Sequence, residues 1–224
     1  MRNALYIVFV LCGLILSVSS TQAADPTALA VQKRYAAISG MRAEFTQLLE
    51  HKESRNREER TGVLHFSKPL LFRWETISPI PELLVVTPEA IWNAFPDEDM
   101  AYKYPSEISQ EMGSIVRIVT GQSNLEKDFY IENTGTKDGI ASLILDPVNP
   151  TVSMTTVALK VEAKTGEIKQ VAIIDFYNNR NTITFSSQTL DPKVDPGLFT
   201  FAPPKGMRVE DRTKEGAFSK PLTQ

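Results

Sequence analysis

The feature of the sequence that most restricts its fold is the alternation of side chains around residues 63–79. Leu64 and Phe66 alternate with less bulky or polar neighbours, and Phe72 and Trp74 do so again after Pro69. A period of two is typical of half-buried strands, and a proline cannot donate to a strand ladder. The pattern predicts two antiparallel strands that turn near Pro69 and place these four side chains on one face.

The apolar face of these two strands must line either a packed core or a cavity that holds an apolar guest. Trp92 and Phe95 belong to a later predicted strand, and we expect their rings to join the same face. A packed core beneath a helix is the commoner arrangement. A curved sheet of many strands can instead enclose a cavity. The residues alone leave both alternatives open.

Short segments of strand character follow one another along most of the chain, separated by proline, glycine and asparagine turns. We expect strands near residues 43–50, 62–67, 70–76, 83–87, 90–95, 100–104, 128–133, 141–145, 154–162, 168–176, 182–188 and 199–201. Strands at this spacing favour an antiparallel sheet over alternating strand–helix units. With 224 residues and no linker-like segment, the chain is expected to form one main domain.

Two amphipathic helices are predicted among the strands. The first has Asp25 as its N-cap and Pro26 as its first residue, and Gly40 is expected to end it. Its apolar positions are Ala28, Val31, Tyr35 and Ile38. The second covers residues 105–121, with apolar positions at Ile108, Met112, Ile115 and Val119. Such stripes need an apolar partner, so each helix is either ordinary core packing or part of a lid.

The first 24 residues have the composition of a cleavable secretory signal. Arg2 precedes an apolar run over residues 4–18, and small residues follow up to Ala23. The run is shorter than the roughly 20 apolar residues that a spanning helix needs, which argues against an uncleaved anchor. Cleavage would remove Cys12, the only cysteine, and a chain without cysteine fits a periplasmic location. We expect residues 25–209 to form the domain and residues 210–224 a polar, mobile tail.

The sequence offers little for catalysis or for nucleic acid. A net charge of −3 without basic clusters argues against nucleic acid and anionic membranes as partners. The only histidines are His51 and His65, and no nucleophile elbow, zinc spacing or phosphate-binding glycine loop occurs. The acidic run at residues 97–99 lacks the remaining spacing of a calcium loop. We therefore expect no enzyme activity, no cofactor and no metal.

Five groups of residues resemble, in order, the LolA family of periplasmic carriers of outer-membrane lipoproteins. The most specific comprises Lys68-Pro69, Phe72-Arg73-Trp74-Glu75 and Pro79. The others are Phe45-Thr46-Gln47, Trp92 near Pro96-Asp97, Asp175 with Asn178-Asn179 before Thr182, and residues 199–206. The resemblance covers nearly all of the chain after residue 24.

The resemblance implies a mainly β (α+β) fold: a curved, incompletely closed antiparallel β-barrel of about 11 strands, with a helical lid over an apolar cavity. The candidate cavity residues are Leu64, Phe66, Phe72, Trp74, Trp92 and Phe95. The candidate lid residues are Val31, Tyr35, Ile38, Met112, Ile115 and Val119. Lys68 stands where the family often has an arginine thought to hydrogen-bond the lid backbone, so it is either a lid latch or a solvated turn residue.

The same resemblance implies a monomeric periplasmic chaperone that shields the acyl chains of lipoproteins. Its donor would be an inner-membrane ABC transporter (LolCDE) and its acceptor an outer-membrane receptor (LolB). One alternative is another periplasmic lipid- or lipopeptide-binding protein, or a sensor, on the same fold. The other is an interaction domain whose core is filled.

Overall fold

The computed structural model describes residues 25–106 and 114–213, which form one sheet of twelve strands with short helices. The order of the strands is β12-β6-β5-β4-β3-β2-β1-β11-β10-β9-β8-β7. The strands are β1 (Gly40–Glu50), β2 (Arg57–Ser67), β3 (Leu71–Ser78), β4 (Glu82–Val86), β5 (Ile91–Phe95), β6 (Met100–Tyr104), β7 (Phe129–Lys137), β8 (Ile140–Pro147), β9 (Thr156–Glu162), β10 (Glu167–Ile174), β11 (Arg180–Leu190) and β12 (Arg208–Asp211). The helices are α1 (Pro26–Ala37), α2 (Ser114–Val119) and α3 (Leu125–Asp128), with 3-10 turns η1 (Pro96–Glu98) and η3 (Pro196–Phe199).

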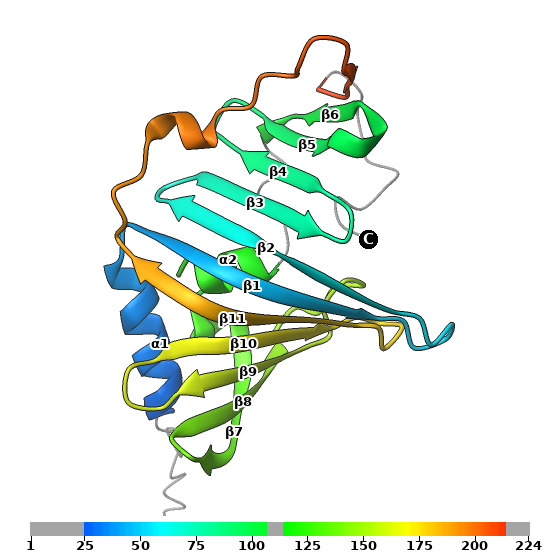
Figure 1. Ribbon diagram of the computed structural model, residues 1–224. Coiled ribbons are helices and arrows are strands. Elements are labelled where there is room, and N and C mark those ends of the chain that lie inside the picture. Colours follow the sequence, from blue (N-terminus) through cyan, green and yellow to red (C-terminus); the bar gives the residue numbers. More distant parts are fainter. Residues whose placement is uncertain (1–24, 107–113, 214–224) are drawn as a thin grey trace, which may run out of the picture.

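Figure 1 shows an open, strongly curved sheet with α1 and α2 on one face. We call this the concave face and the opposite one the convex face. Neighbouring strands pair antiparallel, except that β12 lies parallel to β6. The predicted fold class is confirmed, with twelve strands where about eleven were expected. In the described ranges, no helix has the length and apolar character needed to cross a membrane.

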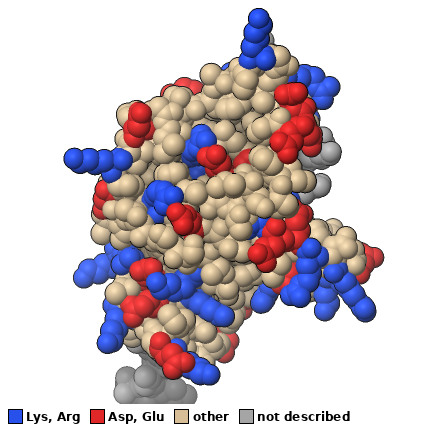
Figure 2. All heavy atoms as spheres, viewed as in Figure 1, with Lys and Arg blue, Asp and Glu red and all other residues tan. Residues whose placement is uncertain are grey.

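Strand pairing explains why the concave face is apolar. One row of paired residues comprises Phe66, Phe72, Val86, Ile91 and Tyr104, and all of them are buried. The next row contains Leu64, Trp74 and Leu84. The intervening residues point to the convex face, because side chains alternate along a strand. There, charges of both signs are interspersed (Figure 2).

Helix α1 forms for the predicted reasons and packs on the concave face. The Asp25 carboxylate accepts hydrogen bonds from the backbone N–H groups of Thr27 and Ala28, both at 2.9 Å. The predicted stripe of Ala28, Val31, Tyr35 and Ile38 is buried in the main core. The helix ends at Ala37, however, and Gly40 begins β1 instead of capping the helix.

Two glycines let other segments approach the backbone of α1. Gly121 follows α2 at φ +70°, and an added Cβ would lie 2.3 Å from the carbonyl oxygen of Tyr35. Gly166 lies in the β9–β10 turn at φ +71°, and its Cβ would lie 2.4 Å from the carbonyl of Ala30. A side chain fits neither the space nor the dihedral angle. Helix α1 is thus held between the end of α2 and one hairpin of the sheet.

The C-terminal part differs from its prediction. The strand expected at residues 199–201 is replaced by η3, where Asp195 accepts a hydrogen bond from Gly197 N and proline begins the turn. An unpredicted strand, β12, pairs with β6 and crosses residue 210, where the polar tail was expected to begin. Its partner lies about a hundred residues away in the chain, so no local pattern reveals it. Residues 1–24 and 214–224, the expected signal and the rest of the tail, lie outside the described residues.

Other boundaries shift for local reasons. Strand β2 begins at Arg57 rather than near Gly62, because the polar residues before Gly62 continue the pairing with β1 as far as Glu50. The second helix was predicted over residues 105–121, whereas α2 covers Ser114–Val119 and residues 107–113 are not described. The short helix α3 was not predicted; Asn124 caps it by accepting a hydrogen bond from Lys127 N.

The close approach at Gly166 makes a testable prediction. Replacing Gly166 with alanine should lower the free energy of unfolding by at least about 2 kcal/mol more than replacing Gly139, because backbone atoms of Ala30 must move. Gly139 is the matched control: it lies in another hairpin turn at φ +80° with no atom within 4 Å of its Cβ position. Its substitution should cost only about 1 kcal/mol, for the dihedral angle. Urea denaturation measures both values, and equal losses would contradict the tight contact.

Candidate functional site

The candidate site is the apolar concave face beneath α1 and α2. Leu64, Phe66 and Phe72 are at most 4% exposed, and Trp74 packs against the same core while remaining partly exposed. The rings of Phe72 and Trp74 stack with centroids 6.3 Å apart. The structure therefore brings these four predicted residues together on one surface.

Phe45 belongs to this surface, although the sequence analysis did not assign it there. Its ring lies 4.1 Å from the Trp74 ring and covers Gly62, where a Cβ would come within 2.7 Å of the Phe45 ring. The alternation of Met41, Ala43 and Phe45 in β1 carries the signal that could have identified it. Gly62 is needed because a Cβ there would lie even closer to the backbone carbonyl oxygen of Glu75 than to the Phe45 ring.

Trp92 does not join the concave face, so that expectation was wrong. Its cross-strand neighbour Val85 alternates with the concave residues of β4. The Trp92 ring instead packs against Phe201 at 5.3 Å on the convex face, with the Lys103 ammonium above it. Phe95 lies three residues further along β5 and points to the concave side, where it meets Tyr102 edge-on at 6.0 Å. Two residues three apart in one strand cannot share a face.

The lid candidates are accounted for as follows. Val31, Tyr35 and Ile38 of α1 and Val119 of α2 are buried in the main core, with Ile118 beside Val119. Met112 lies outside the described residues, and the side chain of Ile115 is not described. Four of the six predicted lid residues therefore cover the concave face.

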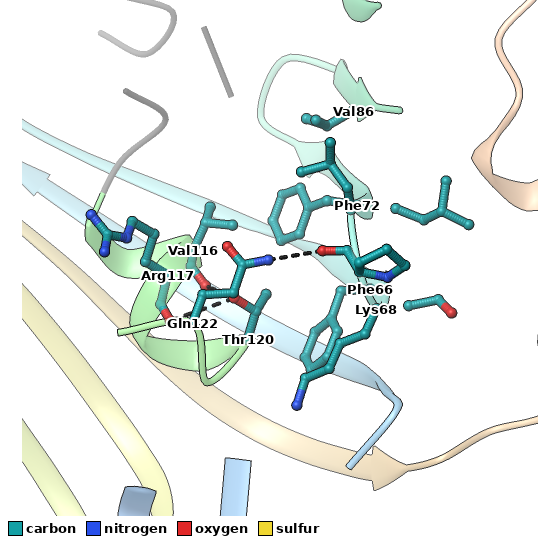
Figure 3. Close-up of a pocket in the computed structure, with 12 residues that line it drawn as sticks. Phe66, Lys68, Phe72, Val86, Val116, Arg117, Thr120 and Gln122 are labelled. Carbon is teal, nitrogen blue, oxygen red and sulfur yellow. Dashed lines mark hydrogen bonds between the residues drawn. The ribbon is translucent and has the colours of Figure 1, made fainter. Parts of the chain in front are cut away.

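Between the described parts of α2 and the β2–β3 turn, the structure has a narrow cleft instead of the roomy cavity that was expected. The cleft between α2 and the β2–β3 turn has a cavity volume of about 30 Å³, which suits one water molecule and no acyl chain. In Figure 3 Phe66 and Phe72 line one side of the cleft, and Val116 of α2 and Thr120, which directly follows α2, line the other. The side chains of the helices occupy the space that a guest would need.

Lys68 contacts the lid backbone. Its ammonium donates hydrogen bonds to the carbonyl oxygens of Tyr35 at 2.7 Å and Ala36 at 3.1 Å, at the last turn of α1. Partial burial lowers the pKa of Lys68, and the nearby carboxylate of Asp191 opposes that shift. Asp191 itself accepts hydrogen bonds from Ser39 N and Oγ and from Gly40 N, which fixes the connection between α1 and β1.

Tyr35 anchors α1 to the opposite half of the sheet. Its hydroxyl donates to Gln188 Oε1 at 3.0 Å and accepts from Ile168 N at 3.1 Å. Burial raises the pKa of Tyr35 to about 12. Arg34 adds an ion pair with Glu167 at 3.3 Å. Helix α1 is thus bonded to the β2–β3 turn, to β10 and to β11.

Helix α2 has fewer polar attachments. Among the described residues, the segment after it is joined to the β2–β3 turn by Gln122, whose amide donates to the carbonyl of Pro69 at 3.0 Å (Figure 3). Arg117 reaches Asp128 only at 3.9 Å, with both side chains well exposed. Such a pair contributes little. Of the two covering helices, α2 is held mainly by its apolar contacts.

The groups considered for catalysis are not assembled into a site. His65 lies on the convex face between its cross-strand neighbours Arg42 and Arg73, and burial, followed by these cations, lowers its pKa. His51 is exposed beside the β1–β2 turn. No group of potential metal ligands occurs within residues 25–106 and 114–213.

Fold and site together define a class: open, curved antiparallel sheets whose apolar concave face is covered by helices. The family model described as "Outer membrane lipoprotein carrier protein LolA" matches residues 36–202. The chain belongs to the LolA family of outer-membrane lipoprotein carrier proteins, as its resemblance predicted. This is a family of transport proteins, and membership confirms the prediction that the chain is not an enzyme.

Individual relatives agree with this assignment. An outer-membrane lipoprotein carrier protein of Neisseria meningitidis serogroup C is 27% identical over 88% of this chain and 92% of its own length. The carrier protein of Chromobacterium violaceum is 27% identical over 86% of this chain and 93% of its own. A solved structure of an uncharacterized conserved protein from Thermus thermophilus shares the fold, with a TM-score of 0.54 and 13% identity over 83% of this chain and 97% of that one.

The buried hydroxyl of Tyr35 predicts a loss of stability in alkali. Its pKa is about 12 in the folded chain against 10 when exposed, so its contribution is complete below pH 10 and is lost as the pH approaches 12. The free energy of unfolding should fall by roughly 2–3 kcal/mol more across this range than in Tyr35→Phe. The exposed Tyr130→Phe is the control and should follow the unmodified chain. Identical pH profiles for all three proteins would contradict the assigned environment.

Proposed function

We propose that this chain is a periplasmic carrier that shields the acyl chains of lipoproteins and transfers them from the inner membrane to an outer-membrane receptor. One observation carries the proposal: a LolA-family sheet has a largely apolar concave face that is covered by helices, α1 and α2 among the described residues. The predicted signal at residues 1–24 supports a periplasmic location.

The energetics explain why such a face must be covered. Each methylene that leaves water contributes about 0.8 kcal/mol, so acyl chains cannot remain exposed during transport. An empty apolar face is equally unfavourable in water, and α1 and α2 fill it in the guest's absence. Their contacts must be given up when a guest enters, which lowers its affinity and makes release possible.

The attachments of the two helices indicate which one moves. Helix α1 keeps its bonds to Lys68, Gln188 and Glu167, whereas α2 leaves the face by breaking the Gln122–Pro69 bond and apolar contacts. Displacement of α2 uncovers Phe66 and Phe72, where the small cleft already begins. In this account Lys68 keeps α1 in place while α2 opens.

The proposed path has a donor and an acceptor. By its family, the chain would take lipoproteins from an inner-membrane ABC transporter (LolCDE) and deliver them to an outer-membrane receptor (LolB), acting as a monomer. Transfer to the receptor requires that the receptor bind the acyl chains more strongly than this carrier does. The return of the lid to the concave face then assists release.

Incubation with spheroplasts tests the proposal. The purified protein should release lipoproteins into a soluble complex, and Phe72→Glu should reduce release at least tenfold, because a charge on the concave face opposes entry of hydrocarbon. Ile77→Glu is the matched control: Ile77 is 57% exposed and faces the other side of the same strand.

The outcomes separate the proposal from its rivals. Release by the Ile77→Glu protein but not by the Phe72→Glu protein, with both folded by circular dichroism, supports it. Failure of the unmodified protein to release lipoproteins overturns it. Mass spectrometry of lipids that copurify would then show whether another lipid is the cargo on the same fold.

A further inference from the structure

A row of polar side chains crosses the otherwise apolar concave face. It contains one residue from each of six adjacent strands: Asn181 of β11, Gln47 of β1, Arg60 of β2, Thr76 of β3, Glu82 of β4 and Asn93 of β5. Gln47 pairs with Arg60 across β1 and β2, and Thr76 pairs with Glu82 across β3 and β4. We call these six residues the polar belt.

Five of the six members are hydrogen-bonded within the belt, in two separate groups. Gln47 donates to Asn181 at 3.0 Å, and Arg60 Nη1 donates to Glu82 at 3.4 Å. Arg60 Nε donates to Glu58, which leaves Nη2 without an acceptor among the described residues. Burial raises the pKa of Glu82, with a hydrogen bond from Asn93 opposing the shift. The belt thus holds a half-buried, charged donor and acceptor side by side.

Stability does not explain the belt. Replacing a buried ion pair by apolar side chains of similar size is often neutral or stabilising. The side chains of Arg60 and Glu82 are only 20% and 18% exposed, so both charges are partly desolvated. An apolar continuation of the surface would fold as well. The charges therefore suit a guest that is itself polar at this point.

The distance from the polar belt to the part of the concave face beneath α2 is comparable to the length of a lipid tail. Phe66, which lines the cleft under α2, lies six positions after Arg60 in β2. At the rise of an extended strand this is roughly 20 Å. One leaflet of a bilayer, half of its hydrocarbon core of roughly 30 Å, is about 15 Å thick, so a lipid tail spans most of this distance. A chain whose tail lies beneath α2 therefore has its polar head at the belt.

We propose that the polar belt binds the head of the cargo, the ester and amide groups that join acyl chains to an N-terminal cysteine. The inference rests on the proposed carrier function and adds where the head lies. Arg60 Nη2 donates to a carbonyl oxygen of an ester or amide linkage. Glu82 accepts from an amide N–H. Charge-assisted bonds of this kind favour an acylated peptide over bare hydrocarbon, because a tail alone leaves the belt unused.

The test compares two probes on the full chain. The first is a synthetic peptide with an N-acyl, S-diacylglyceryl cysteine, and the second is the hydrocarbon dye diphenylhexatriene. The variant Arg60→Leu with Glu82→Leu removes both charges together, so neither charge is left buried without the other, and only the side chain of Asn93 loses its bond to Glu82. Its affinity for the lipopeptide should fall at least tenfold, while its affinity for the dye should stay within about twofold, since two charge-assisted bonds are lost only with the first probe.

A matched control is present on the convex face of the sheet. Arg42 and Glu44 form an ion pair of 2.9 Å there, and Arg42→Leu with Glu44→Leu should change neither affinity. Two results would overturn the proposed role of the polar belt while leaving the carrier function intact. One is unaltered lipopeptide binding by the Arg60/Glu82 variant, and the other is an equal loss of affinity for both probes. If the unmodified protein binds neither probe, both the proposed carrier function and the proposed role of the polar belt are wrong.

Discussion

The need to keep one apolar sheet face out of water governs this structure. Alternation in β1 to β6 places large side chains such as Phe45, Phe66 and Phe72 on a single surface, and curvature gathers them. No second sheet covers that surface among the described residues; two helices do. The same hydrophobic effect that closes the face in water favours hydrocarbon there, so in the proposed function the covering helices and the cargo compete for one surface. That competition is what a carrier requires.

The cover has two parts of different character. Helix α1 is tied down by Tyr35 and by the bonds from Lys68, and its backbone is approached closely at Gly121 and Gly166. Helix α2 is held mostly by apolar contacts. A guest's own hydrocarbon can replace contacts of this second kind without leaving a buried polar group unpaired, which is why the proposed mechanism opens at α2 rather than at α1.

Local pattern was sufficient for much of the fold. The period of two in β2 and β3, the N-cap at Asp25 and the turn chemistry each depend on neighbours in the chain, and the structure contains them. The position of Trp92 could also have been predicted from the sequence, because it lies three residues from Phe95 in one strand and so must face the other way. Trp92 was assigned to the concave face because it is hydrophobic, without regard to the alternation of side chains along the strand.

Other features depend on contacts distant in sequence. Strand β12 forms only because β6 offers an edge, and the polar belt becomes visible only when the register of six strands is known. The filling of the cavity likewise depends on how deeply α1 and α2 insert, which no stripe of apolar residues specifies. The functional surface is therefore less predictable than the sheet that carries it.

Distance measurement by double electron–electron resonance tests the central claim most directly. The sequence has no cysteine after Cys12, so label pairs can be introduced at exposed Arg117 of α2 and Ile77 of β3, and at Leu29 of α1 and Ile77. On addition of an acylated cysteine peptide, the account predicts a longer Arg117–Ile77 distance and an unchanged Leu29–Ile77 distance. Saturable binding of the peptide with both distances unchanged would contradict it.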